Sequence, residues 1–444
     1  MAEIPINAFS GMNNLVSQFY AKKGVASPRV ILNADVTRGG QVSKRSGLTE
    51  LLSLPNAHSL WACPTCMLCA SNGVLYDVST HTATSIATIS GSKTEPLSYV
   101  LVENSVYISN PYWSGVYNLT SRDIGSWGID LPSGPVLITT DGGLPAGTYH
   151  VVFTSVSGGN LSGNGPVSSI TLSDTGGIQI VGKPADTIVW ATDQNGIHFN
   201  YVGDVNTIVE IPTVEPLPSF MCCPPPNMQC LAYAFGRVWG GYGNELHYSE
   251  PYQPGWFKPT SNIFTFDSKI TLIAPVATGL FVGMSDSTIF LMGTEPDKMA
   301  QIDAGAGSIR GTLAYANNLP ELGDVLGTPE KGFVDVPLWR TSDGIVVGNV
   351  SGKLYNLTKN KLKMGVPVMG ASLYRQKDGE FQFLTSADSG NASSGAGSSD
   401  SVLTAIVKNG KLTTTNKYNP PDSSVVGVVE DVSCSHTRGG VPVE

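Results

Sequence analysis

Short stretches in which apolar and polar residues alternate are spread along the whole chain. Residues 147–156 alternate cleanly, and residues 100–102, 187–190 and 345–347 are short runs rich in β-branched side chains. Turn-forming residues flank these runs. Alternation with a period of two favours strands, because successive side chains of a strand point to opposite faces. The pattern predicts an all-β protein built from many short strands.

One turn-plus-strand unit is repeated. Ser-Gly-Val-Tyr-Asn-Leu-Thr at 114–120 recurs as Ser-Gly-Lys-Leu-Tyr-Asn-Leu-Thr at 351–358, and weaker copies stand at 72–79 and 244–249. The units between residues 59 and 131 are spaced by about 40 residues, which is typical of a four-stranded propeller blade. The repetition predicts a β-propeller of about five to seven blades.

The two close copies invite a more detailed prediction. We expect them to form the same strand in two different blades. In that arrangement, Gly115 and Gly352 make the turn before the strand, and Tyr117 and Tyr355 pack between neighbouring blades.

The character of the chain changes in the middle. Residues 134–213 contain six or seven short predicted strands, which suits a β-sandwich of the fibronectin type III or immunoglobulin kind. This segment has no cysteine pair, which favours the fibronectin-like version. We therefore expect a sandwich inserted into the propeller. The predicted division is an N-terminal arm with the first strands (1–50), blades (51–133), the sandwich (134–213), then further blades with a closing strand at 425–429 (214–444).

Composition excludes long helices and membrane-spanning segments. The 444 residues include 50 glycines and 29 prolines, and only 14% are charged. No run approaches the roughly 20 apolar residues of a transmembrane helix, and the N-terminus lacks the features of a signal peptide. A soluble protein made in a cytosol is expected. The net charge of -9 opposes wrapping of DNA on the outer surface, but it allows a channel through which DNA slides.

Three cysteines at spacings of three, Cys63, Cys66 and Cys69, form the most conspicuous local motif. Thiolates bind zinc and iron–sulfur clusters, and a fourth ligand could come from Cys222, Cys223 or Cys230. In a strand, residues 63 and 69 share one face and residue 66 points to the other, so a metal site needs a turn that gathers them. The alternative is three buried thiols in the core. A disulfide is disfavoured in a reducing cytosol.

Residues for catalysis are not indicated. The six histidines are scattered singly, with none of the spacings of a zinc protease, and the chain has no nucleophile elbow or phosphate loop. The sequence therefore predicts no catalytic residues.

Three segments stand out by their order. The first has Asn-Ala-Asp-Val at 33–36, a Gly-Gly turn at 39–40 and Lys-Arg-Ser-Gly-Leu-Thr at 44–49. The second opens with Ala-Gly-Thr-Tyr at 146–149 and closes with Phe-Asn-Tyr-Val-Gly-Asp-Val at 199–205. The third runs from Gly-Arg-Val-Trp at 236–239 through 243–251 to Pro254 and Trp256-Phe257. Together they resemble propeller-type tail proteins of tailed bacteriophages, which include the nozzle, or packaged-DNA stabilisation, proteins of short-tailed phages.

This resemblance implies a structural virion protein of the tail, made in the host cytoplasm. Proteins of that family form a ring, commonly sixfold, around the tail axis, so a homo-oligomeric ring, a hexamer, is expected. The expected partners are other tail proteins (adaptor, tube and fibres) and DNA that passes through the channel without specific binding. The family is not enzymatic, so the resemblance implies no catalytic residues. The alternatives are a receptor- or glycan-binding tail adhesin and a glycan hydrolase on a propeller.

Overall fold

The computed structural model describes most of the chain after residue 50. It covers residues 50–316 apart from 92, 213 and 214, residues 335–377 apart from 360 and 363–367, and residues 380–388, 402–408 and 411–418. Before residue 50 it covers 8–9, 11–13, 15, 25–28, 31, 34–36 and 40–44. The regular structure of these residues is strands apart from one 3₁₀ turn, η2 (Pro296–Lys298). The all-β prediction is confirmed.

Six antiparallel sheets, each a meander of at least four strands, follow one another along the described residues; we call them sheets 1 to 6. Sheet 1 contains β5 (Ala57–Ala62), β6 (Met67–Ser71), β7 (Val74–Asp77) and β8 (Thr84–Thr88). Sheet 2 contains β9 (Ser98–Val102), β10 (Ser105–Asn110), β11 (Trp113–Asn118) and β12 (Ile124–Gly125). Sheet 3 contains β21 (Cys230–Ala234), β22 (Arg237–Tyr242), β23 (Glu245–Glu250) and β24 (Gln253–Phe257), with β25 (Ile263–Thr265) also paired to β23.

The last three sheets lie further along the chain. Sheet 4 contains β26 (Ile270–Val276), β27 (Gly279–Met284), β28 (Ser287–Met292) and β29 (Ala300–Ala306). Sheet 5 contains β30 (Ala314–Ala316), β31 (Val336–Thr341), β32 (Gly344–Gly348) and β33 (Leu354–Asn356). Sheet 6 contains β34 (Met369–Lys377), β35 (Glu380–Asp388), β36 (Val402–Lys408) and β37 (Lys411–Tyr418).

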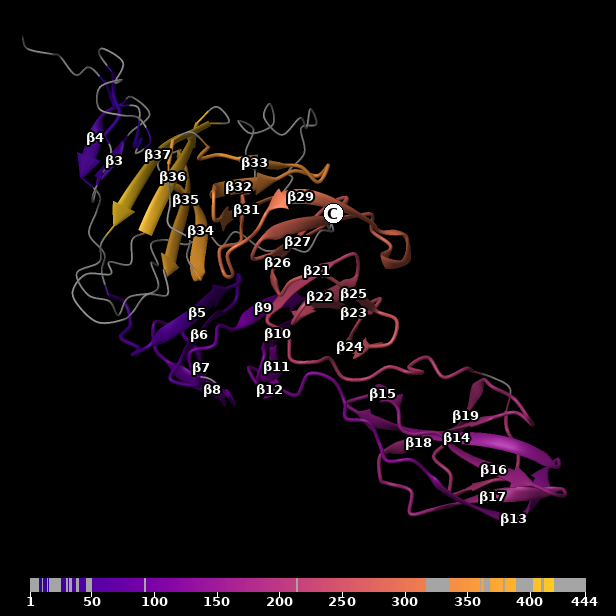
Figure 1. Cartoon of the computed structure of the whole chain (residues 1–444). Helices are drawn as coiled ribbons and strands as arrows, with labels where there is room; N and C mark the ends of the chain where they lie inside the picture. Colours follow the sequence, from indigo (N-terminus) through magenta and orange to yellow (C-terminus); the bar gives the residue numbers. More distant parts are fainter. Residues whose placement is uncertain are drawn as a thin grey trace, which may run out of the picture.

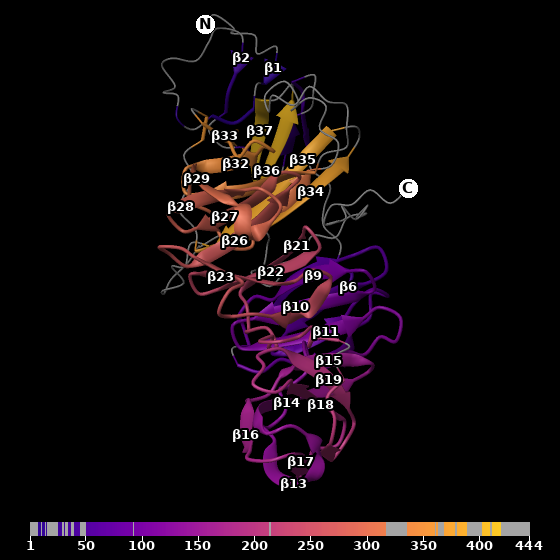
Figure 2. The same ribbon diagram turned by 90° about the vertical axis from the view of Figure 1, so that its right-hand side faces the viewer.

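Neighbouring sheets share buried apolar cores, and the first strands of several neighbours touch: β9 and β21, β21 and β26, β30 and β34. The shared cores join sheets 1 and 2 at Leu75 and Val106, 2 and 3 at Val100 and Val238, 3 and 4 at Trp239 and Leu280, 4 and 5 at Phe281 and Trp339, and 5 and 6 at Leu338 and Phe383. Alternating strands can bury both faces in this way when each sheet lies between two others. The arrangement is consistent with a β-propeller (Figures 1 and 2).

A separate unit interrupts the series between sheets 2 and 3. One of its sheets contains β13 (Val136–Leu144), β17 (Gly176–Val181) and β20 (Thr207–Ile208). The other contains β15 (Asn160–Asn164), β14 (Gly147–Ser157), β18 (Thr187–Thr192) and β19 (Phe199–Gly203), with β16 (Ser168–Leu172) paired to β14. Both sheets contribute to one core, in which Phe153 and Ile178 are buried. Figures 1 and 2 show this unit at the opposite end of the molecule from sheets 5 and 6.

The repeated segment, 114–120 and 351–358, behaves differently from the prediction. Its first copy lies in β11, the third strand of sheet 2, and its second in β33, the fourth strand of sheet 5, so the two are not the same strand of two blades. Gly115 is inside β11, opposite Ile108, whereas Gly352 does lie in a turn, with φ +81°. The tyrosine prediction is confirmed, because Tyr117 is buried in the core of sheets 1 and 2 and Tyr355 packs against that of sheets 5 and 6.

The two copies share the way in which their strands end. The side-chain oxygen of Asn118 accepts a hydrogen bond from the backbone N–H of Thr120 at 2.8 Å, and that of Asn356 accepts one from Thr358 at 2.9 Å. Such Asx turns take the backbone out of the sheet. The repeated sequence therefore specifies how the strand ends. The position of the strand in its sheet depends on the residues around it.

Segments near the two ends of the described chain lie together. β3 (Ala34–Val36) pairs with β4 (Val42–Lys44) and contacts β37 of sheet 6. β1 (Ala8–Phe9) pairs with β2 (Val25–Ala26). The predicted closing strand at 425–429 lies outside the described residues. In the part of the chain that is described, no helix has the length and apolar character needed to cross a membrane.

Candidate functional site

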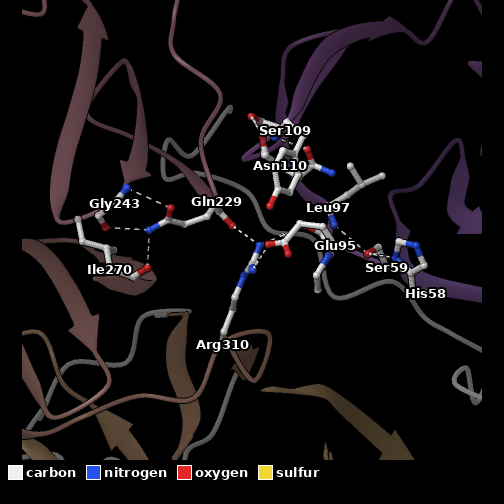
Figure 3. A network of polar contacts seen from close by, with 12 residues as sticks. His58, Ser59, Glu95, Leu97, Ser109, Asn110, Gln229, Gly243, Ile270 and Arg310 are labelled. Atoms are coloured by element: carbon white, nitrogen blue, oxygen red, sulfur yellow. Dashed lines mark hydrogen bonds and ion pairs between the residues drawn. The ribbon is translucent and has the colours of Figure 1, made fainter. Parts of the chain in front are cut away.

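A polar cluster joins the segments that lead into the first strands of several sheets (Figure 3). Arg310 lies between β29 and β30, while Glu95 and Gln229 lie just ahead of β9 and β21. The guanidinium forms an ion pair with Glu95 through Nη1, and its Nη2 donates to the carbonyl oxygens of Pro96 and Gln229, both at 3.2 Å. We call Glu95, Gln229 and Arg310 the Arg310 cluster. It brings together residues that are up to 215 positions apart in the sequence.

The side chain of Gln229 extends the cluster to sheet 4. It is buried, and its Nε2 donates to the carbonyl oxygens of Gly243 at 2.9 Å and Ile270 at 2.8 Å. Its Oε1 accepts a hydrogen bond from the backbone N–H of Gly243 at 3.1 Å. The carbonyl of Arg310 itself accepts from the N–H of Gly370, in β34, at 2.9 Å. The cluster thus connects sheets 2, 3, 4 and 6.

Two serine hydroxyls add further connections, one between sheets 1 and 2 and one between sheet 2 and the segment ahead of sheet 3. Ser59 Oγ accepts a hydrogen bond from the N–H of Leu97 at 2.9 Å, and Ser109 Oγ accepts one from Met228 at 2.8 Å. The ring of His58 lies beside Ser59, with Nδ1 2.8 Å from Ser59 Oγ. Burial lowers the pKa of His58, so its ring is uncharged at neutral pH. The charged side chains of the cluster are therefore Arg310 and Glu95.

The charges of the cluster are partnered within the chain, so the cluster stabilises the fold. The side chains of Arg310 and Glu95 are only 16% and 23% exposed, so both charges have lost most of their water. Such a pair is tolerated when each charge has a partner and good hydrogen bonds, and loss of one partner leaves the other charge stranded. The guanidinium here binds one carboxylate and two carbonyls of the same chain. These contacts fix the first strands of the sheets relative to one another.

The structure brings together two of the three cysteines of the predicted metal set. Cys63 and Cys66 lie in the loop between β5 and β6 with their sulfur atoms 3.2 Å apart. Cys69 lies in β6, and its S–H donates to the carbonyl of His58 at 3.5 Å. Among the described residues, no group of three or more His, Cys, Asp or Glu side chains is placed to hold a metal ion. Zinc or an iron–sulfur cluster at these cysteines remains a sequence-based prediction.

The cysteines considered as a fourth ligand lie in and before sheet 3. Cys222 and Cys230 are buried, and Cys223 is half-buried. Burial raises the pKa of Cys230 to about 11, and it also raises that of Cys222 to about 11. Both are protonated at neutral pH, as expected for thiols in a core.

The segment at 236–257 forms most of sheet 3 and fixes the base of the inserted unit. Trp256, in β24, donates from Nε1 to the carbonyl of Leu161, in β15, at 2.8 Å. Trp127, which precedes the inserted unit, donates to the carbonyl of Pro254 at 2.8 Å. Ser219 Oγ donates to the carbonyl of Ser162 at 2.7 Å on the returning chain. The inserted unit is therefore held at its base by hydrogen bonds from β24 and from the returning segment, and the segment that leads into it is bound to β24 through Trp127.

The sequence did not single out the Arg310 cluster. Arg310, Glu95 and Gln229 each stand a few residues ahead of a strand, and this position was the only signal available. Charged residues beside strands are ordinary solvated residues in most proteins. Their convergence depends on the packing of sheets that are distant in sequence.

Comparisons with known proteins give distant structural likenesses. No protein-family model matches the chain, and no curated protein sequence matches it significantly. The fold is similar to that of BBS1N, solved in complex with ARL6DN, with 9% identity and a TM-score of 0.32 over 78% of this chain and 91% of that one. It is also similar to the extracellular domain of the putative hybrid two component system BT4673 from B. thetaiotaomicron, with 9% identity and a TM-score of 0.30 over 83% and 46% of the two chains. Saccharomyces cerevisiae Sqt1 matches at 10% identity and a TM-score of 0.28 over 73% of this chain and 77% of its own. These are β-propeller proteins, and at such scores the likeness carries no argument about function.

Proposed function

We propose that the chain is a structural protein of a bacteriophage tail that assembles into a homo-oligomeric ring, a hexamer, around the DNA exit channel. The observation that carries the proposal is the order of three segments, 33–49, 146–205 and 236–257, that resemble tail nozzle proteins. In this proposal the six sheets are the blades of one propeller, and the unit between β13 and β20 is a fibronectin type III-like sandwich. The role is mechanical, and catalysis has no part in it.

The packing of the sheets supports a mechanical role. Apolar cores between successive sheets contain large, fully buried side chains such as Trp239, Phe281 and Trp339. Close-packed interiors of this kind transmit force with little deformation. The Arg310 cluster adds hydrogen bonds just ahead of the first strands of sheets 2 and 3. A subunit built in this way suits a ring that keeps its shape while DNA passes.

The inserted unit supplies a surface for a neighbouring tail protein. Val136 and Val181 are cross-strand partners on β13 and β17, and they are 60% and 45% exposed. Ile138, two residues along β13, is 45% exposed on the same face. β13 is an edge strand of its sheet. Exposed apolar residues on the outermost strand of a sheet are typical of a contact surface.

The charge of the chain suits a channel that does not retain DNA. The net charge is -9, so phosphates gain little from the walls of a ring of such subunits. Lys44 is exposed on β4, whereas Arg38 and Arg45 lie outside the described residues. We expect the purified protein to show no retention of duplex DNA at physiological salt.

The experiment is to determine the assembly state of the purified chain by native mass spectrometry and electron microscopy, and to locate it on phage particles with an antibody. Closed rings and tail labelling are expected. The double variant Val136→Glu and Val181→Glu should leave the subunit folded and abolish its incorporation into tails. Ile197→Glu is the matched control, because Ile197 is 77% exposed and lies in the connection between β18 and β19, outside that sheet.

Two results would overturn the proposal. A monomer that binds host cells or envelope glycans by itself would indicate an adhesin. Release of sugars from host envelope material, lost on substitution of a carboxylate pair, would indicate a glycan hydrolase.

A further inference from the structure

The loop between β5 and β6 holds two thiols in a geometry close to that of a disulfide. The backbone N–H of Cys63 donates to the carbonyl of Cys66 at 2.9 Å, which closes the loop. The sulfur atoms are 3.2 Å apart, and a disulfide requires about 2.05 Å. A small rotation of the two side chains covers the difference of about 1 Å. The backbone is thus already arranged for the bond.

The two sulfur atoms of the loop have different environments. Thr65 Oγ1 lies 3.5 Å from Cys63 Sγ. Burial opposes ionisation of Cys63, but hydrogen bonds from Thr65 and Cys66 outweigh it and lower the pKa of this thiol. Burial and the hydrogen bond with Cys63 raise the pKa of Cys66. In the exchange described below Cys63 attacks first, and the site itself depends on the two sulfur atoms lying 3.2 Å apart.

A side chain from the next sheet holds the loop in place. Arg122 follows β11 in sheet 2, and its Nη2 donates to the carbonyl of Thr65 at 3.0 Å. Its Nη1 forms an ion pair with Asp77 at 3.0 Å. Pro64 and Thr65 are exposed above the two buried sulfurs, so the loop faces solvent. A small reagent needs only a local opening of this loop to reach Cys63.

We propose that Cys63 and Cys66 form a reversible dithiol–disulfide site that reacts with low-molecular-mass disulfides of the glutathione class. The site is independent of the proposed tail function. Cys69 has no part in it, because its S–H is directed to the carbonyl of His58.

The reaction balances as two thiol–disulfide exchanges. The Cys63 thiolate attacks the small disulfide, forms a mixed disulfide and releases one small thiolate, which takes up the proton lost by Cys63. Cys66 then loses its proton and attacks the Cys63 sulfur, which forms the Cys63–Cys66 bond and releases the second small thiolate. Two protein thiols and one small disulfide give one protein disulfide and two small thiols. The state at equilibrium depends on the surrounding thiol-to-disulfide ratio and on the reduction potential of the pair, so a reducing cytosol favours the dithiol and an oxidising compartment favours the disulfide.

The test uses the full-length folded protein. The protein is equilibrated with mixtures of reduced and oxidised glutathione, and free thiols are then blocked with N-ethylmaleimide under denaturing conditions. Trypsin cleaves after Arg45 and Lys93 and has no site between them, so one peptide carries Cys63, Cys66 and Cys69. We expect this peptide to pass from three labels to one as the oxidant increases, with a loss of two hydrogens and the remaining label on Cys69. Dithiothreitol should restore all three labels.

Cys66→Ala is the matched control, and its peptide should keep labels on Cys63 and Cys69 or carry one glutathione on Cys63. Four outcomes would overturn the proposal. The first three are three labels in the wild-type peptide at every ratio, a bond that includes Cys69, and bond formation in urea-unfolded protein at a less oxidising ratio than in the folded protein. Protection of the three thiols by stoichiometric zinc would also overturn it, in favour of the metal site.

Discussion

Replacing Arg310 by methionine removes the charged group at the centre of the Arg310 cluster. Methionine keeps much of the length and apolar volume of the arginine stem, so the change is mainly the loss of the guanidinium. Glu95 is then left largely buried without its partner, and the carbonyls of Pro96 and Gln229 each lose a hydrogen bond. The variant is expected to fold and to be less stable.

The magnitude follows from the burial of the pair. Breaking a fully buried ion pair costs about 3–5 kcal/mol. The 16% and 23% exposure of the two side chains leaves some water to screen Glu95, which places the cost near the lower end of that range, at about 3 kcal/mol. Glu95→Gln keeps an acceptor for the guanidinium but removes its counter-charge, so it is expected to cost about 2 kcal/mol. The double variant should show a coupling energy of about 1–2 kcal/mol, because the two side chains touch.

The assay is urea unfolding followed by tryptophan fluorescence, combined with amide hydrogen exchange. Exchange should accelerate at the starts of β9 and β21, where the N–H groups of Leu97 and Leu231 bind serine hydroxyls. Lys298→Met is the matched control, since Lys298 and its partner Glu295 are 78% and 66% exposed and their ion pair is screened by water. This control should be indistinguishable from the wild type.

Two results would refute the reasoning. If the free energy of unfolding of Arg310→Met lies within about 0.5 kcal/mol of that of the wild type, the cluster does not stabilise the fold. Additive effects of Arg310→Met and Glu95→Gln would mean that the two side chains do not depend on each other.

Three further predictions concern the cores and turns. Phe281→Ala should cost about 3–5 kcal/mol in urea unfolding, because this fully buried ring packs on Phe290 and Trp339 between sheets 4 and 5; a cost below about 1 kcal/mol would contradict the shared core. Gly352→Ala should lower stability by about 1–2 kcal/mol, because the residue has φ +81° and a methyl group there would meet the ring of Phe290; Gly125→Ala, with nothing within 4 Å of the added atom, should be close to neutral, and equal effects would count against the argument. Asp77→Asn should lower the melting temperature at neutral pH. Burial raises the pKa of Asp77, but hydrogen bonds from Ser79 and Tyr117 and the charge of Arg122 lower it by more, so the folded pKa lies below the ordinary 3.8. The stabilisation is present above pH 3.8 and is lost as the pH falls through the folded pKa, so the difference between wild type and variant should shrink in acid; a difference that stays constant across this range would refute the assignment.

The sequence by itself determined the local structure of this protein. Alternation in residues 147–156 predicts β14, and the short β-branched run at 345–347 predicts β32, because the period of two is a property of the strand alone. The same holds for the Asn-Leu-Thr endings at 118–120 and 356–358, whose Asx turns involve residues two positions apart. Repeated units of this kind indicated a propeller, with which the six successive sheets are consistent.

Only the tertiary structure decided which distant residues meet. Gly115 and Gly352 are both the second residue of the repeated segment, yet one lies inside a strand and the other in a turn, since the position of a strand in its sheet depends on pairing with neighbours. Cys63 and Cys66 meet and Cys69 turns away, because the loop after β5 reverses the chain between them. Arg310 meets Glu95 across 215 positions because sheets 2 to 6 bury their faces against one another. The free energy gained by burying apolar surface is roughly proportional to the area buried and does not depend on which residues cover it. An apolar pattern therefore predicts that one face of a strand is buried, whereas the packing of the whole chain determines which residues bury it.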